Sequence, residues 1–338
     1  MADIKIVCPE TKRPLVKKNT AYVNEDSSNE ISYQIINHIP RFIDTESYAG
    51  AFGYQWRVFQ KTQLDSYTKV NYSQSRLERV LGAEANTLAG KTVLEVGCGA
   101  GRFTEVFLNK KAKVYSTDLS SAVEANYSNF SEKHSYFLAQ ADLYKLPFEY
   151  GSFDYVFCLG VLQHTPDSEK SIKELSRYLK PSGTLLIDHY KTITNSNKKV
   201  RFRFLKNLVN TNYLLREILL GRNPKTTVRV TKVVTDLFWP LHVFANYLRR
   251  KQFLTFLSKI LLRISPLFDY HITFSELDSK IMKEWMWLDL HDSVTDQYKS
   301  LKDKGQILEY LNNANLENIH VWEDGNGIEA RATKRTTS

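Results

Sequence analysis

The sequence predicts an α/β fold with a mostly parallel sheet, helices on both faces of the sheet and an antiparallel end. Three observations predict it. Residues 91–190 alternate short apolar runs with helical periodicity, which is typical of parallel strands joined by helices. A turn dense in glycine, residues 97–101, follows the first apolar run. Near the end of the chain, two strand patterns are joined through "GNG", which indicates a hairpin.

Five strands are expected within residues 91–190. Their sequences are "TVLEV", "AKVYST", "SYFLAQ", "FDYVFCLG" and "GTLLIDHY". The stretch "SEKSIKELSRYL" carries helical periodicity between the last two of these strands. Later in the chain, "GQILEYLNNANL" predicts a helix, and "ENIHVWED" and "GIEARATK" predict the terminal hairpin.

The 338 residues divide by pattern into four parts. Residues 1–50 form a small, polar, short-stranded N-terminal module, and residues 51–90 form a helical entry or lid segment. Residues 91–190 and 299–338 form the α/β domain. Residues 191–298 form a basic, mainly helical insertion between the fifth and sixth strands.

Composition favours an ordinary globular protein, with 42% hydrophobic and 25% charged residues. The three cysteines, Cys8, Cys98 and Cys158, lie far apart. This spacing excludes a disulfide framework and a paired-cysteine metal site, so we predict no metal and a reducing compartment. The first residues, "MADIKIVCPETKRPL", lack the long apolar core that is typical of a signal peptide, and no apolar run approaches the roughly 20 residues that span a bilayer. We therefore expect a cytoplasmic protein.

The net charge of +9 is unevenly placed. Residues 191–265 hold sixteen lysines and arginines against two acids, a local net charge of +14, while the rest of the chain carries −5. Three interpretations of this segment remain open. Its apolar face covers an acceptor pocket as a lid, or it lies on an anionic membrane surface, or it binds RNA phosphates. Because the positive charges are interleaved with Phe, Leu, Ile and Val, the sequence disfavours nucleic acid.

The stretch "VLEVGCGAGRF" places Gly97, Gly99 and Gly101 where a ligand can approach the backbone closely. Arg102 stands where the dinucleotide fingerprint requires glycine or alanine, and no Gly-Lys-Ser/Thr follows as in a phosphate loop. Glu95, just before the turn, is unfavourable for pyrophosphate and favourable for a ligand with an ammonium group.

Two more acids follow strands at the same edge of the predicted sheet. Asp118 can accept hydrogen bonds from both hydroxyls of a ribose. Asp142 can bind the amino edge of an adenine while Leu143 contacts its face. Leu119 and Leu159 complete the expected apolar shell. Together these residues indicate a nucleoside with a charged amino-acid tail.

On these residues, the chain resembles a class I S-adenosylmethionine-dependent methyltransferase of the Rossmann-like kind. The matching stretches are "VLEVGCGAGRF", "STDLS", "ADLYKLPF", "FDYVFCLGVLQHTPD" and "LKPSGTLLI". The resemblance implies a seven-stranded sheet with the last strand antiparallel. It also implies that the three glycines face the methionine part of S-adenosyl-L-methionine, with Asp118 at the ribose and Asp142 at the adenine. The product would be S-adenosyl-L-homocysteine.

The N-terminal region carries a weaker resemblance. "CPETKRPLV" and "HIPRFID" are similar to a small zinc-ribbon-like module, but only Cys8 of its four cysteines is present, so we interpret this part as a metal-free remnant. "FGYQWRVFQKTQLDSY" resembles the entry helices of bacterial methyltransferases of saccharide, lipid and natural-product pathways. This resemblance places Gln55 and Trp56 near the cofactor; aromatic packing onto the sheet is the alternative.

Methyl transfer from a sulfonium requires alignment more than a catalytic side chain, and a general base assists when the acceptor is a hydroxyl. The candidates are His164 after the fourth strand, Tyr190 with His189 after the fifth, and His291 in "WMWLDLHDSVTDQYKS". A structural role is the alternative for each. Asp154 opens the fourth strand at the opposite edge of the sheet, so we expect it to be structural.

We therefore predict a methyltransferase that acts, through oxygen, on a small-molecule, saccharide or lipid-linked acceptor, with peripheral contact to an anionic membrane. A quinone-type C- or O-methyltransferase is the nearest alternative. An RNA methyltransferase and a non-catalytic cofactor-binding scaffold are the others.

Overall fold

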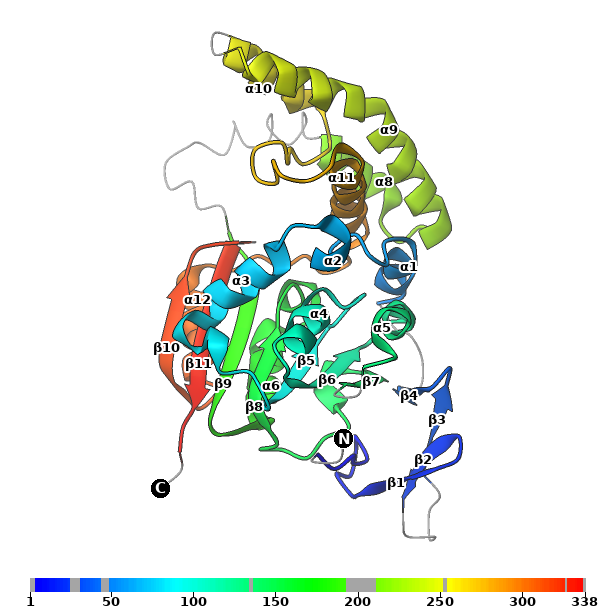
Figure 1. The fold of residues 1–338 in the computed structure, drawn as a ribbon, viewed down its shortest axis with the longest axis vertical. Helices are drawn as coiled ribbons and strands as arrows, with labels where there is room; N and C mark the ends of the chain where they lie inside the picture. Colours follow the sequence, from blue (N-terminus) through cyan, green and yellow to red (C-terminus); the bar gives the residue numbers. More distant parts are fainter. Residues whose placement is uncertain are drawn as a thin grey trace. The chain divides into compact units, whose positions relative to one another are not determined.

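The computed structural model describes residues 4–24, 31–43, 49–133, 136–192, 211–251, 254–325 and 327–336 (Figure 1). The chain divides into two compact units. The sheet unit comprises Met1–Gln60, Asn71–Thr192 and Tyr298–Ser338, and the helical unit comprises Lys61–Val70 and Ile193–Gln297. The basic stretch 193–210 of the expected insertion lies outside the described residues.

Seven strands of the sheet unit form the expected mixed sheet. Its order is β7-β6-β5-β8-β9-β11-β10, and all pairs from β7 to β9 are parallel. β11 runs antiparallel to both β9 and β10, so the predicted antiparallel last strand is confirmed. The strands are β5 (Thr92–Val96), β6 (Lys113–Asp118), β7 (Tyr136–Ala141), β8 (Phe153–Cys158), β9 (Leu179–Tyr190), β10 (Leu316–Trp322) and β11 (Gly327–Lys334).

The order and direction of the strands indicate where a ligand binds at this sheet. The order reverses at β5, because β6 and β7 lie on one side of it and β8 and β9 on the other. In open parallel sheets, ligands bind outside the carboxyl ends of the strands at such a reversal. The residues that follow β5, β6, β7 and β8 are therefore the ones to consider as a site.

The N-terminal strands continue the same sheet. They are β1 (Leu15–Lys18), β2 (Ala21–Asn24), β3 (Ser32–Ile36) and β4 (Ile39–Phe42), and they pair as an antiparallel meander. β4 then pairs in parallel with β7 through Arg41 and Phe42, which extends the sheet to eleven strands. Short strands were expected in this region, but their continuity with the central sheet was not.

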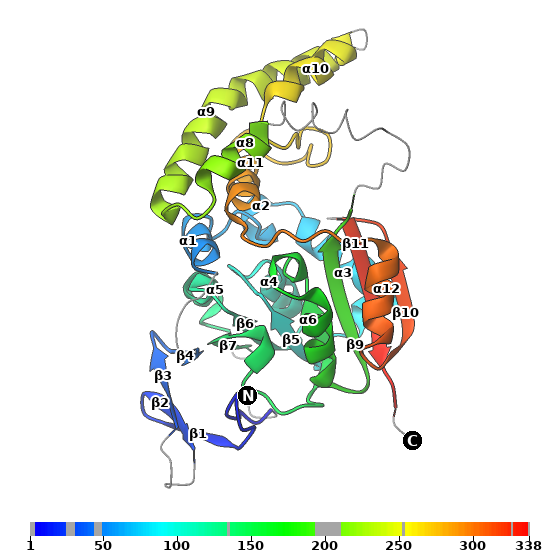
Figure 2. The same ribbon diagram turned by 180° about the vertical axis from the view of Figure 1, so that it is seen from behind.

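Helices cover the sheet on both faces, as predicted (Figures 1 and 2). Successive side chains of β5 point to opposite faces of the sheet. Val93 packs with α3 and α4 on one face, whereas Leu94 packs in a second core cluster with α6 and α12 on the other. The helices of this unit are α1 (Gly50–Val58), α3 (Tyr72–Leu81), α4 (Arg102–Asn109), α5 (Ala122–Phe130), α6 (Ser168–Arg177) and α12 (Lys304–Asn312). Short helical turns are η1 (Gly82–Asn86), η2 (Leu143–Lys145) and η3 (Leu162–His164).

The helical unit has its own packing. It contains α2 (Asp65–Thr68), α8 (Thr211–Leu219), α9 (Pro224–Arg249), α10 (Thr255–Leu261), η5 (Leu262–Ile264) and α11 (Ser279–Thr295). The Asn223 side chain and Pro224 begin α9, as is common at helix N-termini. Trp287 of α11 donates to Thr231 of α9 (3.1 Å), which joins these helices. Among the described residues, no helix is both long enough and apolar enough to cross a bilayer.

Candidate functional site

The glycine turn joins β5 to α4 through left-handed backbone. The φ angles of Gly97, Gly99 and Gly101 are 76°, 52° and 104°, a region that residues with side chains rarely adopt. The amides of Gly97 and Cys98 donate to Thr117 O (2.7 and 3.0 Å), which ties the turn to β6. A side chain at Gly97 would overlap Val161, so the loop after β8 lies directly against the turn.

Asp118 lies at the carboxyl end of β6 and holds this turn. Its Oδ2 accepts from the Gly99 amide (2.9 Å), and its Oδ1 accepts from the amide and hydroxyl of Ser120 (2.8 and 2.7 Å). The carboxylate is half-buried. Rotation about one side-chain bond removes the Ser120 hydroxyl from Oδ1, so a ligand hydroxyl can take its place on a carboxylate that the backbone keeps oriented.

The loops after β6 and β7 are also connected. Asp142 begins η2, where its Oδ1 accepts from the Tyr144 amide (2.9 Å), and Leu143 is buried beside it. Gln140 donates to the carbonyl of Leu119 (3.0 Å), which fixes the residue after Asp118. Both acids therefore lie at the carboxyl edge of neighbouring strands, each followed by an apolar residue.

Helix α1 packs against the glycine turn. A Cβ atom on Gly99 would lie 3.0 Å from Cε2 and 3.1 Å from Nε1 of Trp56, so the indole contacts the turn. Gln55 of the same helix is buried. Gly53 permits this approach, because a side chain there would overlap Ser121 at the start of α5. The structure thus brings Trp56 to the turn from a segment more than 40 residues away.

Glu95 is only 4% exposed and lies in a buried polar network. The hydroxyls of Thr104 and Ser116 donate to its Oε2 (2.6 and 2.7 Å). Thr104 in turn accepts from Asn126 (3.1 Å). Burial raises the pKa of Glu95 to about 7, although the two hydroxyls oppose that rise. The network joins β5 and β6 to α4 and α5 beneath the turn.

Two of the three candidate catalytic residues lie together. The His164 ring packs between Phe52 of α1 (centroids 5.1 Å apart) and Tyr190 at the end of β9 (5.5 Å), both edge to face. Gln163 Nε2 lies 3.2 Å from His164 Nε2. Leu159, also at this edge after β8, is buried.

The other two histidines considered as bases, His189 and His291, are buried. His189 Nε2 lies within hydrogen-bond distance of the Ser168 and Ser300 hydroxyls (3.0 and 3.2 Å), and burial lowers its pKa. His291 belongs to α11 of the helical unit, where burial lowers its pKa to about 4. His291 is therefore neutral at pH 7.

Asp154 contacts residues that hold the start of β5, which agrees with the structural role expected for it. Its Oδ2 accepts from the amide and hydroxyl of Thr92 at the start of β5 (2.8 Å each), and Lys180 lies 3.0 Å from its Oδ1. Thr92 begins β5, so this group lies at the edge opposite to the glycine turn.

A buried charge network supports the site, and sequence reasoning missed it. Arg76 of α3 forms ion pairs with Asp188 of β9 and with Glu329 of β11. Asp188 Oδ1 accepts from the Gly160 amide (2.5 Å), which holds the loop whose Val161 contacts Gly97. The only available signal was an acid at the end of an apolar run, "TLLID", since its ion-pair partner Arg76 lies 112 residues earlier in the chain.

Part of the chain is similar in sequence to known methyltransferases. Residues 94–187 match a family model described as "Methyltransferase domain". Over 134 residues the chain is 31% identical to the tRNA U34 carboxymethyltransferase of Campylobacter curvus, covering 39% of this chain and 42% of that protein. Over 140 residues it is 30% identical to the ubiquinone biosynthesis O-methyltransferase of Pseudomonas paraeruginosa, covering 40% and 56%. The chain spans about half the length of the curated relatives it matches.

A solved O-methyltransferase family protein from Burkholderia thailandensis aligns with 81% of this chain and 60% of its own, at 12% identity and a TM-score of 0.44.

Proposed function

Because residues 94–187 match a methyltransferase domain, we propose that the protein is a class I S-adenosylmethionine-dependent methyltransferase that transfers a methyl group to an oxygen of a small-molecule, saccharide or lipid-linked acceptor. The proposal rests on the hydrogen bond that joins the glycine turn to Asp118, at the place where the strand order of the sheet reverses. A carboxylate held by the backbone, beside a turn without side chains, suits a ribose diol and the tail of an amino acid.

The residues present fit the cofactor. Asp118 binds the ribose hydroxyls, Asp142 binds the adenine amino group, and Leu119, Leu143 and Leu159 supply apolar contact. The backbone of Gly97, Gly99 and Gly101 lies along the methionine part. Trp56 and Gln55 cover the turn from α1, and Glu95 supports it from beneath. S-adenosyl-L-homocysteine, the product, binds the same residues.

Alignment and proton removal are the tasks left to the protein. S-adenosyl-L-methionine supplies a methyl group that its sulfonium already activates. Holding the acceptor in line contributes roughly 7–11 kcal/mol. His164, in contact with Tyr190, accepts the proton of an acceptor hydroxyl and contributes about 10²–10⁴-fold. His291 was the other histidine considered as a base, but it is fully buried in the helical unit, and a pKa lowered to about 4 makes it a weak proton acceptor at pH 7.

The helical unit supports a lipid-linked acceptor. Leu237 and Val233 on α9 and Phe256 on α10 are 71%, 66% and 73% exposed. Basic residues lie on the same helices, among them Arg229, Lys232 and Lys259. Exposed apolar side chains next to positive charge are typical of helices that lie on anionic membranes.

Two alternatives have support from the relatives. The ubiquinone O-methyltransferase supports a quinone acceptor, and the tRNA U34 carboxymethyltransferase supports an RNA acceptor. Incubating the protein and labelled cofactor with cell extract, followed by separation of lipid, saccharide, small-molecule and RNA fractions, distinguishes the acceptor classes. Label in a saccharide, in a small molecule or in a lipid other than a quinone supports the proposal, and label confined to RNA contradicts it. Label in a quinone establishes that alternative.

The cofactor site has a separate test. We expect S-adenosyl-L-homocysteine at about 100 times its Kd to stabilise the wild-type protein by roughly 3 kcal/mol. Asp118→Ala should abolish the shift in melting temperature. Asp154→Ala is the matched control, because it lowers the starting melting temperature but should retain the shift. Equal shifts in Asp118→Ala and wild type would contradict the assignment.

A further inference from the structure

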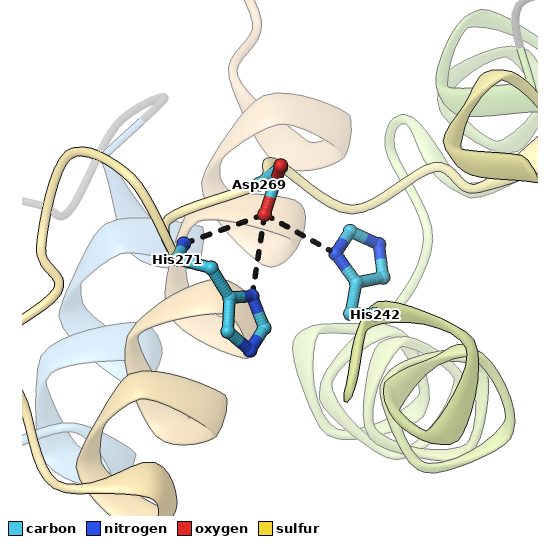
Figure 3. A group of neighbouring side chains, drawn as sticks. All are labelled: His242, Asp269 and His271. Atoms are coloured by element: carbon cyan, nitrogen blue, oxygen red, sulfur yellow. Dashed lines mark hydrogen bonds and ion pairs between the residues drawn. The ribbon is translucent and has the colours of Figure 1, made fainter. Parts of the chain in front are cut away.

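We propose that His242, Asp269 and His271 of the helical unit bind one divalent transition-metal ion of the zinc class. His242 lies on α9, and the other two residues lie between η5 and α11 (Figure 3). One potential ligand atom from each residue lies within 4.8 Å of the others. Asp269 Oδ1 is 3.2 Å from His271 Nδ1 and 3.9 Å from His242 Nδ1. Ligands about 2.0–2.2 Å from one zinc ion lie roughly 3–4 Å from each other.

His242 is already oriented as a metal ligand. The residue is 1% exposed, and its Nδ1 has no hydrogen-bond partner in the part of the chain that the structure describes. A buried polar nitrogen without a partner requires an explanation. Its Nε2 lies 2.8 Å from the Ser265 hydroxyl. An imidazole that ligates through Nδ1 donates from Nε2 to such an oxygen, which fixes the ring orientation.

Asp269 presents one oxygen to the two imidazoles. Arg249 of α9 binds Oδ2 (2.5 Å), which leaves Oδ1 for the histidine side. The carboxylate therefore lies between Arg249 on one side and the two imidazoles on the other.

Two further residues of α9, Trp239 and Arg249, lie on the same helix face as His242 and contact the other two proposed ligands. Trp239 and His242 are three residues apart, and Arg249 is seven residues further on, so all three share one helix face. The Trp239 ring stacks on His271 with centroids 5.7 Å apart and an interplanar angle of 24°. The Asp269 side chain remains 22% exposed, so the cluster is accessible to solvent.

The donor set selects the kind of metal. Two imidazole nitrogens and one carboxylate oxygen suit zinc and neighbouring transition metals, whereas calcium and magnesium prefer oxygen ligands alone. With three protein ligands, the fourth position remains for water. The ion would connect α9 to the segment at residues 265–271, which otherwise has little regular structure.

Cobalt and zinc titrations test the proposal. The full chain, freed of metal with a chelator, is titrated with Co²⁺ while its visible spectrum is recorded, and Zn²⁺ is then used to displace the cobalt. We expect one ion per chain. His242→Asn, Asp269→Asn and His271→Asn should each weaken Zn²⁺ binding by more than tenfold. Ser265→Ala, which removes only the orienting hydroxyl, should weaken it by about 10–100-fold.

His320→Asn is the matched control, because His320 is an exposed histidine on β10 and its loss should leave the affinity unchanged. Circular dichroism establishes that each variant is folded. X-ray absorption of the zinc-loaded wild type requires no variant, and it should show a first shell of nitrogen and oxygen only. No cobalt binding, sulfur in the first shell, or unchanged affinity in the folded ligand variants would overturn the proposal.

Discussion

Gly101 ends the glycine turn with a φ of 104°, and the ring of Phe130 occupies the place where a side chain would begin. Gly101→Ala adds left-handed strain of about 1–2 kcal/mol and overpacking of about 1–3 kcal/mol. We expect the free energy of unfolding in urea to fall by roughly 2–5 kcal/mol. Gly160→Ala is the control, since Gly160 has a φ of 77° with no atom within 4 Å of its Cβ position. Equal losses would contradict the role of Phe130.

Glu95 makes stability depend on pH. Its pKa is raised from 4.5 to about 7 in the folded protein, so the folded state binds more protons than the unfolded state between these values. Its stabilising contribution is complete below pH 4.5 and is lost as the pH rises to 7. Glu95→Gln keeps an oxygen for Thr104 and Ser116 but does not titrate.

We therefore expect this variant to lose less stability than wild type between pH 4.5 and 7, by roughly 3 kcal/mol as an upper value. Urea unfolding at several pH values measures the difference. Parallel curves for the two proteins would show that Glu95 does not titrate in this range.

At the scale of elements, Arg76 joins three parts of the sheet unit. It connects α3 to β9 and β11 through two carboxylates, Asp188 and Glu329, that are both fully buried in the structure. Arg76→Met leaves these charges without that partner, and we expect a loss of about 3–5 kcal/mol in the free energy of unfolding. Lys5→Met, which breaks an exposed pair with Glu149, should cost less than about 1 kcal/mol. Similar losses in both variants would contradict the importance of burial.

The elements differ in how well sequence predicts them. The strands β5, β6, β7 and β8 were predicted within one or two residues, because each is an apolar run bounded by turn residues. The hairpin of β10 and β11 followed from its own turn. The pairing of β4 with β7 was not predicted, because its partners are about 100 residues apart and short strands carry little pattern.

The site divides in the same way. Glycines next to a strand mark the turn, and an acid at a strand end marks Asp118, since these signals are local. Trp56 against Gly99, the Arg76 network and the His242 cluster each depend on tertiary contacts between distant segments. The histidines of that cluster are 29 residues apart, without a known ligand spacing, so the sequence predicted no metal.

At the scale of the whole molecule, positive charge is concentrated in residues 191–265, whereas the rest of the chain is net negative. We expect the full-length protein to float with vesicles that contain anionic lipid at low salt, because each basic residue near such a surface contributes about 1 kcal/mol. About 0.5 M NaCl should release most of the protein through screening. Neutral vesicles should bind little, and Phe256→Asp should weaken binding. Absence of binding at low salt would remove the membrane from the proposed function.

The parallel pairing of β4 with β7 has a consequence for the solubility of shortened chains. Arg41 and Phe42 occupy the hydrogen-bonding edge of β7, and the Arg41 guanidinium also donates to Gln140 (2.9 Å). A chain that begins after residue 43 would present β7 as a bare edge strand, which is a template for intermolecular strand addition. Such a truncation should aggregate at concentrations where the full chain remains monodisperse, even though every residue of the glycine turn is retained.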